Sequence, residues 1–321
     1  MPSNQTPLGA LPARFRRERV LIVGCGDVGL RAARRLSAVK LIALTSSPDR
    51  IPDLRREGIT PLVGQLDQPK TLQRLAGIAH RVLHLAPPPG EGRADWWRDP
   101  RTHALLQVLR KRSAPQTLVY GSTSGVYGDC EGAWVNESQS LQPSTHRAQR
   151  RVDAENSVRH FGRQSAGRSA KGTAVRTCIL RIPGIYAPDR VGGTPRERLL
   201  RGTPVLRRED DVFTNHIHAD DLARACVLAL WRGKAQRIYN VNDDTELRMG
   251  DYVDLAADLY GMAKPPRLSR ADAQKTLPLN LLSFMGESRR LVNTRMKKEL
   301  RLVLRFPTVR EGLQPQVGLD L

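Results

Sequence analysis

The chain has 321 residues, of which 40% are hydrophobic, and no apolar stretch approaches the roughly 20 residues of a transmembrane helix. This length and composition predict a soluble globular protein with one large or two smaller domains, and exclude a membrane-spanning one. The 52 Lys and Arg against 32 Asp and Glu give a formal net charge of +20, yet the basic residues are scattered and only 5% of residues are aromatic. Without a nucleic-acid-binding module, we expect neither nucleic acid nor a membrane as a partner.

The N-terminal segment 1–18 carries prolines and arginines but lacks the apolar segment of a secretory signal. We therefore expect a flexible leader and a cytoplasmic protein. The cysteines are far apart and form no C-x-x-C pair, which argues against a zinc knuckle and a disulfide framework. We expect all of them to be reduced and structural: Cys25, Cys130, Cys178 and Cys226.

The first predicted strand, residues 20–23, leads directly into glycines spaced G-x-G-x-x-G, and residues 30–36 continue as a helix. In a dinucleotide-binding turn the first glycine permits the tight bend, the second admits the pyrophosphate, and the third lets the helix pack on the strand. The free N–H groups at the start of the helix face the phosphates. The residues expected to contact the cofactor here are Gly24, Gly26, Asp27, Val28 and Gly29.

The second predicted strand, residues 40–44, ends without the acidic residue that usually holds the ribose 2′-hydroxyl of NAD. Thr45 and Ser46 follow the strand, and Arg50 lies one turn later. Ser47 and Pro48 are typical of an N-cap and a first helical residue, which places Asp49 inside the next helix. Hydroxyls and a guanidinium suit a 2′-phosphate, so we expect NADP as the preferred cofactor, with NAD as the alternative.

Three more predicted strands, residues 59–63, 80–86 and 117–120, alternate with helices. This order predicts a Rossmann-type doubly wound parallel sheet, an α/β fold covered by helices on both faces. Ligands bind such sheets at the carboxyl ends of the strands, so the loops after these strands should converge. Asp67 either lies at the adenine edge or caps the following helix, and the cap is favoured. The loops add four expected cofactor contacts: Gln65, Leu66, Ala86 and Pro87.

The later part of the chain predicts a smaller, mainly helical C-terminal lobe. Segment 162–171 is basic and contains glycine, so it is interpreted as an exposed loop. The helices expected beyond residue 244 are 247–259, 271–277 and 291–300. Arg289 and Arg290 are candidates for binding an anionic group, but a solvated run of charge is the favoured interpretation.

Three adjacent hydroxyl residues follow the strand at 117–120, in the segment 121–128 (GSTSGVYG). This segment resembles the STSGVYG-type segment of extended short-chain dehydrogenases/reductases, the NAD-dependent epimerase/dehydratase family. Segments 180–190, 215–223 and 239–243 resemble further family segments in the same order. The resemblance covers about residues 20–245. It implies a dinucleotide-binding domain and a substrate lobe, here expected at 19–185 plus 215–245 and at 186–214 plus 246–321.

Enzymes of this family use a Ser or Thr, a Tyr and a Lys to oxidise or reduce a carbonyl/alcohol pair. Thr123 lies four residues before Tyr127, where the family places its Ser or Thr. When the end of the next helix, near residues 145–155, is matched to the family, the Lys position becomes Arg151 and the Tyr position becomes Arg147. Arginine stays protonated and cannot donate the proton. The resemblance therefore implies catalytic roles for Thr123, Tyr127 and Arg151.

The usual Tyr-x-x-x-Lys dyad is missing from its expected place. The spacing occurs once, at Tyr260 and Lys264, far downstream, where a chance match is favoured. The proton source stays open among Tyr127, Tyr186 and His146.

Two histidines, His216 and His218, would share one side of an extended segment and superficially suggest a metal pair. We favour His218 as a structural hydrogen-bond partner before a helix at 220–232, with Asp220 or Asp221 as its cap. No metal is expected. The helix itself should bury Leu222, Cys226, Ala229 and Leu230.

The sequence thus predicts an NAD(P)-dependent oxidoreductase of the epimerase/dehydratase type, acting on a small anionic or sugar-like substrate. The alternative is an NAD(P)-binding regulator or sensor without turnover, which the missing dyad favours. A nucleic-acid-associated protein is the weakest hypothesis. The expected partner is a small-molecule substrate. The sequence does not decide whether the protein forms a homodimer.

Overall fold

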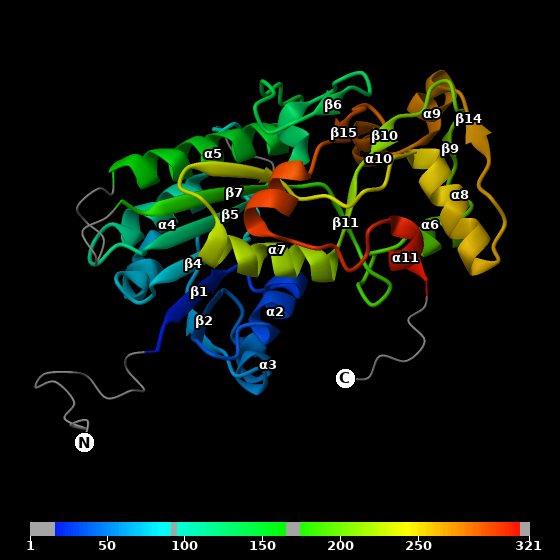
Figure 1. The fold of residues 1–321 in the computed structure, drawn as a ribbon. Helices are drawn as coiled ribbons and strands as arrows, with labels where there is room; N and C mark the ends of the chain where they lie inside the picture. Colours follow the sequence, from blue (N-terminus) through cyan, green and yellow to red (C-terminus); the bar gives the residue numbers. More distant parts are fainter. Residues whose placement is uncertain (1–16, 91–94, 165–173, 315–321) are drawn as a thin grey trace, which may run out of the picture.

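The computed structural model describes residues 17–90, 95–164 and 174–314, and Figure 1 shows their arrangement. Most of the predicted leader lies outside these residues. Seven parallel strands form the central sheet in the order β12-β7-β5-β4-β1-β2-β3. Their bounds are Arg19–Val23 (β1), Lys40–Thr45 (β2), Thr60–Val63 (β3), Arg81–His84 (β4), Thr117–Thr123 (β5), Arg176–Ile182 (β7) and Arg237–Asn240 (β12).

The side chains of β1 explain why this strand lies in the middle of the sheet. Val20 and Ile22 pack into a core on one face, and Leu21 and Val23 into a core on the other. A strand that is apolar on both sides is typical of a parallel sheet with helices on both faces. The predicted α/β fold with a doubly wound parallel sheet is confirmed.

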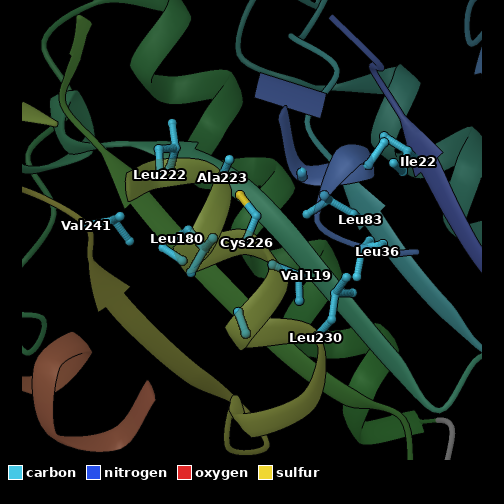
Figure 2. Close-up of a cluster of buried hydrophobic side chains, with 14 of the residues drawn as sticks. Ile22, Leu36, Leu83, Val119, Leu180, Leu222, Ala223, Cys226, Leu230 and Val241 are labelled. Atoms are coloured by element: carbon cyan, nitrogen blue, oxygen red, sulfur yellow. The ribbon is translucent and has the colours of Figure 1, made fainter. Parts of the chain in front are cut away.

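Helices cover the two faces of the sheet. In Figure 1, α4 (Pro100–Leu109) and α5 (His146–Gln164) lie on one side, and α2 (Asp27–Arg34) and α7 (Ala219–Arg232) on the other. Figure 2 shows Leu222 and Cys226 of α7 in the same apolar cluster as Val119 and Leu180 of the sheet. The four residues that the sequence predicted for the core of α7 are all buried.

A second group of helices lies beside the sheet, at the right of Figure 1, around short pairs of strands. Its helices are α6 (Arg196–Leu200), α8 (Met249–Tyr260), α9 (Arg270–Thr276), α10 (Leu279–Phe284) and α11 (Val309–Leu313). The short strand pairs are β8 (Gly184–Tyr186) with β11 (His216–His218), β9 (Val205–Leu206) with β14 (Arg267–Leu268), β10 (Phe213–Thr214) with β13 (Leu247–Arg248), and β6 (Trp134–Val135) with β15 (Arg290–Leu291). None of the helices in the described residues is long and apolar enough to cross a membrane.

Several element boundaries differ from those predicted. The helix expected after Ser47 is a 3-10 turn, Pro48–Arg50 (η1), followed by α3 (Ile51–Arg56). Residues 69–75 form a 3-10 helix (η2) with Gln68 at its N-cap, so Asp67 is not the cap. Helix α5 continues through Gln164, and the rest of the predicted loop 162–171 lies outside the described residues.

The predicted helix 291–300 is instead β15 followed by a short π-helix, Met296–Leu300 (η4). The amide of Asn293 donates to the backbone carbonyls of Asn242 and Asp243, at 2.9 and 3.3 Å, and these contacts hold the chain between the two elements. Met296 and Leu300 then pack with α7 against the large sheet, although the sequence assigned this segment to the second lobe. Tertiary contacts have thus replaced only the beginning of the predicted helix, and the rest is helical with a π-type turn.

Candidate functional site

A cleft of about 250 Å³ opens at the carboxyl ends of β1, β4 and β5. Strand order reverses beside β1, because β2 follows on one side and β4 on the other, and ligands of doubly wound sheets bind at such a reversal. The loops after Val23, Leu85 and Tyr120 all reach the cleft, as the sequence predicted, whereas those after Leu44 and Val63 do not line it. The lining residues are Gly24, Gly26, Asp27, Val28, Gly29, Leu85, Gly121, Ser122, Thr123, Arg147, Arg151, Ile182, Pro183, Ile185, Arg190 and Leu222.

The three glycines of the loop have different surroundings. Gly24 has φ +88°, and a Cβ there would lie 2.3 Å from the backbone nitrogen of Ala86, so only glycine fits beside the loop after β4. A Cβ on Gly29 would lie 3.0 Å from the carbonyl oxygen of Gly24, which keeps α2 close to the strand. A Cβ on Gly26 would meet nothing within 4 Å. The backbone at Gly26 is therefore open to a ligand at the start of α2.

Charged side chains connect the start of α2 to later segments of the chain. Arg31 donates to Asp27, Asp189 and Asp220, at 2.9, 2.7 and 2.8 Å. Arg190 forms a second ion pair with Asp27, at 3.2 Å. The carboxylate of Asp27 is thus neutralised by two guanidinium groups beside the loop. Sequence reasoning missed this network, because its members are separated by up to 189 positions.

The hydroxyl of Thr123 lies at the end of β5 and lines the cleft. Its Oγ1 accepts a hydrogen bond from the backbone N–H of Gly125 at 3.3 Å, which caps the short 3-10 helix Ser124–Tyr127 (η3). The cap orients the side chain, and within the described residues its O–H donates to no acceptor. Thr123 can therefore donate a hydrogen bond to a ligand oxygen in the cleft.

The structure places Tyr127 outside the lining of this cleft. Its side chain is 0% exposed, and its hydroxyl donates to Oδ1 of Asn240 at 2.7 Å. The guanidinium of Arg181 lies 4.7 Å from the ring centre, and burial raises the pKa of the phenol. Tyr127 packs η3 against β12, and the resemblance that placed it in catalysis has no geometric support here.

The other two proton sources left open by the sequence also lie outside the lining of the cleft. Tyr186 is buried, and its hydroxyl donates to the carbonyl of Thr308 at 3.2 Å. His146 stacks on Trp96, with 4.4 Å between the ring centres. Among the described residues, no tyrosine or histidine lines the cleft.

Helix α5 brings Arg147 and Arg151 to the cleft, the positions that the resemblance matched to the family's Tyr and Lys. One nitrogen of Arg151, Nη1, donates to the hydroxyl of Tyr120 at 2.9 Å and to the carbonyl of Gly121 at 2.8 Å. These bonds hold the side chain of Arg151 against the end of β5. Arg147 lies one helical turn earlier on the same helix.

The other expected cofactor contacts lie beyond the lining of this cleft, at the ends of β2, β3 and β4. Arg50 donates from Nη1 to the carbonyl of Cys25 at 2.8 Å, which connects the end of β2 to the glycine loop. Thr45 and Ser47 exchange hydrogen bonds of 3.1 and 3.2 Å beside Ser46. The remaining contacts that the sequence named follow β3 and β4: Gln65, Leu66, Ala86 and Pro87.

One ion pair joins the loops after β3 and β4. Arg101 of α4 pairs with Asp67 at 2.6 Å and donates to the carbonyl of Pro87 at 3.2 Å. Neither role predicted for Asp67 included an ion pair with Arg101. No local sequence pattern could reveal this pair, because the two residues are 34 positions apart.

His216 and His218, which superficially suggested a metal pair, have structural partners instead. His218 itself caps α7, because its Nδ1 accepts from the backbone N–H of Asp220 at 3.2 Å. The expected cap by Asp220 or Asp221 is therefore wrong; Asp221 instead accepts from the backbone of Phe306 at 2.8 Å. His216 stacks on Tyr252 with ring centres 4.1 Å apart.

Arg289 and Arg290 are also occupied by protein partners. Arg289 donates to the carbonyl of Gly128 at 2.6 Å and pairs with Glu287 at 2.8 Å. Arg290 donates to the carbonyl of Gly132 at 2.7 Å and pairs with Glu246 at 2.8 Å. Neither arginine lines the cleft.

The doubly wound sheet, with its glycine-rich loop at the strand reversal, defines a class of α/β proteins with a ligand cleft at the carboxyl edge. A profile of the NAD dependent epimerase/dehydratase family matches residues 20–242 of this chain. The chain belongs to this family, and the resemblance found in the sequence is confirmed.

Solved structures of other proteins have the same fold. A functionally unknown conserved protein from Silicibacter pomeroyi is 27% identical, with a TM-score of 0.74 over 92% of this chain and 97% of that one. MoeE5, whose structure holds UDP-glucose and NAD, shares the fold at 21% identity and a TM-score of 0.68, over 92% and 96% of the two chains.

A longer plant protein matches part of the chain. It is a trifunctional UDP-glucose 4,6-dehydratase/UDP-4-keto-6-deoxy-D-glucose 3,5-epimerase/UDP-4-keto-L-rhamnose-reductase from Arabidopsis thaliana, 25% identical over 169 residues. The match covers 50% of this chain and 24% of the plant protein.

Proposed function

We propose that the protein is an NAD(P)-dependent oxidoreductase of the epimerase/dehydratase type that acts on a small anionic or sugar-like substrate. The observation that carries the proposal is the cleft itself, which brings the glycine loop together with Thr123 and Arg151. Family membership and the UDP-glucose and NAD held by MoeE5 support the same class of ligand.

The residues present fit a dinucleotide. The open backbone at Gly26 suits its diphosphate. So do the N–H groups that the start of an α-helix leaves without intrahelical partners. Thr45, Ser46 and Arg50 would hold the adenosine end, and Arg151 the ribose next to the nicotinamide. When bound, the cofactor supplies the hydride acceptor or donor.

The chain's own residues would act on the substrate oxygen. Thr123 donates a hydrogen bond to a carbonyl or hydroxyl oxygen, and the charge of Arg151 stabilises negative charge that develops there. Arginine cannot donate the proton, so these groups orient and polarise the substrate without serving as a general acid. We assign Tyr127 a packing role in place of the catalytic role that the resemblance implied.

The proposal is tested by cofactor binding and by turnover. Calorimetric titration of the full chain with NADP and with NAD should show saturable binding of at least one of them. The loaded protein, mixed with UDP-glucose or UDP-glucuronate, should show a change in nicotinamide absorbance or a changed sugar in the product. If neither dinucleotide binds, the proposal is overturned.

A second candidate is a dinucleotide-binding sensor without turnover. The observation that favours it is the position of Tyr127, buried against Asn240 and away from the cleft. Tight cofactor binding that changes the protein's protection from proteolysis, together with no turnover of any UDP-sugar, would favour this candidate over the enzyme.

A further inference from the structure

Three arginines on the α5 side of the cleft form no ion pair with a carboxylate of the described residues. Arg147, Arg150 and Arg151 occupy little more than one turn of the helix. Arg150 donates to the carbonyl of Trp96 at 3.0 Å, and Arg151 donates to the oxygens of Tyr120 and Gly121. All three acceptors are neutral. Arg147 makes no hydrogen bond or ion pair with any described residue.

The acidic residues nearby have other partners. Buried Asp99 lies in the field of Arg151, but its carboxylate accepts from the hydroxyl of Thr102 at 2.7 Å. On α5 itself, Glu155 forms a buried ion pair with Arg181 at 2.7 Å, and Asp153 bonds to His103 at 2.9 Å. Asp27 is the one carboxylate that lines the cleft within the described part of the chain, and it is neutralised by Arg31 and Arg190. The cleft therefore has a net positive lining.

Arg147 lies within the field of its cationic neighbours. Arg147 is exposed to solvent where it lines the cleft. Partial burial and the charges of Arg151 and Arg150 lower the pKa of its guanidinium. Like charges held together without a counterion are unfavourable, and a bound anion would relieve this repulsion.

Two buried polar atoms in the lining also lack partners. The hydroxyl of Ser122, whose side chain is 4% exposed, has no hydrogen bond among the described residues. The same holds for Nε of Arg151, which is 7% exposed. Buried polar groups are nearly always satisfied, so a ligand that reaches Ser122 and Arg151 would supply partners that the described residues do not.

From these observations we infer that the substrate carries an ionised oxyanion group, a carboxylate or a phosphate, at its reacting end, and that Arg147 binds it beside Ser122 and Arg151. This inference rests on the proposed function and narrows its substrate class to acidic sugars or sugar phosphates. A guanidinium matches both oxyanions through two parallel N–H donors. The cofactor's own diphosphate belongs at the other end of the cleft, at the glycine loop.

The test compares charged and neutral ligands that share one sugar ring. The dinucleotide-loaded full chain is titrated calorimetrically with glucuronate, glucose 6-phosphate and glucose at constant ionic strength. We expect at least one of the two anions to bind about tenfold or more tightly than glucose. The tighter of the two tells whether the group is a carboxylate or a phosphate.

Variants of α5 assign that preference to one side chain. Arg147→Gln should reduce the preference to within about twofold, and Arg147→Lys should keep part of it, because charge remains while the paired donors are lost. Arg163→Gln removes the same charge from an exposed position near the far end of α5 and should leave the preference unchanged. Retained dinucleotide binding shows that each variant is folded.

Equal affinity for the three sugars, binding of none of them, or a preference that survives Arg147→Gln would each overturn the inference. Failure of the proposed function is distinguishable from these outcomes, because in that case neither NAD nor NADP binds the native chain.

Discussion

At the scale of single residues, the cleft depends on a few side chains whose positions are fixed by backbone contacts. The Oγ1 of Thr123 is held by the N–H of Gly125, and the guanidinium of Arg151 by the carbonyl of Gly121. Both side chains are thereby oriented before a ligand arrives, which lowers the cost of binding in the reactive geometry.

Replacing Thr123 with alanine should remove most of the turnover and leave cofactor affinity intact. One hydrogen-bond donor to the reacting oxygen is worth about 100-fold in rate. Loss of the η3 cap should also cost about 1 kcal/mol of stability, measured by denaturant unfolding. Thr123→Ser keeps the hydroxyl and should retain much of the activity; unchanged turnover in Thr123→Ala would exclude the role.

Arg50 should decide the choice between the two dinucleotides. Its guanidinium lies just beyond β2, whose end carries Thr45 and Ser46 in place of an acidic residue, and only one of its nitrogens bonds to Cys25. Arg50→Gln should weaken NADP binding about tenfold and change NAD binding little. Calorimetry of the exposed variant Arg55→Gln is the control. Tighter binding of NAD than of NADP by the native chain would contradict the prediction.

At the scale of elements, the turn between β1 and α2 depends on two glycines for different reasons. Gly24 lies against the backbone of Ala86 with a positive φ, whereas Gly26 faces open space. The first glycine thus serves packing, and the second leaves room for the cofactor.

Alanine substitutions should separate these two roles. Gly24→Ala should lower the free energy of unfolding by about 2–4 kcal/mol, because the new methyl group meets backbone and the φ is strained. Gly26→Ala should leave the melting temperature nearly unchanged while lowering dinucleotide affinity. Thermal melts and calorimetry of both variants check this. A stable Gly24→Ala protein, or full cofactor affinity in Gly26→Ala, would count against the proposed arrangement.

At the scale of the whole molecule, buried polar groups lie where the two groups of helices meet. Asp243 follows β12 and is 1% exposed, and its carboxylate accepts from the backbone N–H of Thr245 at 3.0 Å. Burial raises the pKa of this carboxyl from 3.8 to about 7. The folded chain therefore keeps a proton that the unfolded chain loses above about pH 4.

This difference makes stability depend on pH in a defined direction. Between about pH 4 and 7 the folded state binds more protons at Asp243, so its contribution to stability falls as the pH rises and is constant above that window. Buried His84 and His216 act oppositely, because burial lowers the pKa of each from 6.5 to about 3, and stability is gained as the pH rises through that range.

Asp243→Asn isolates the carboxyl group. Relative to the native chain, this variant should gain up to about 4 kcal/mol between pH 4 and pH 7.5, since the amide does not ionise. Denaturant unfolding at several pH values measures the difference, and a difference that does not vary with pH would contradict the assignment. His216→Asn serves as the control with the opposite slope.

The amino-acid sequence by itself determined the family, the parallel sheet and the glycine loop. Alternating apolar strands and helices, and glycines at fixed spacing, act locally, so they can be read along the chain. The core face of α7 was predicted for the same reason. The resemblance of two segments to the family implied site roles for Thr123 and Arg151, and both residues line the same cleft.

Only the tertiary structure decided which side chains face the cleft and which bond to other parts of the protein. Tyr127 bonds to Asn240, Asp67 pairs with Arg101, and Arg147 is left facing the cleft, and none of these outcomes follows from neighbouring residues. The beginning of the predicted helix 291–300 is strand and irregular chain, and the π-helix 296–300 that follows packs on α7. The physical reason is the same throughout: hydrogen bonds, ion pairs and burial between residues far apart in the chain outweigh local preference.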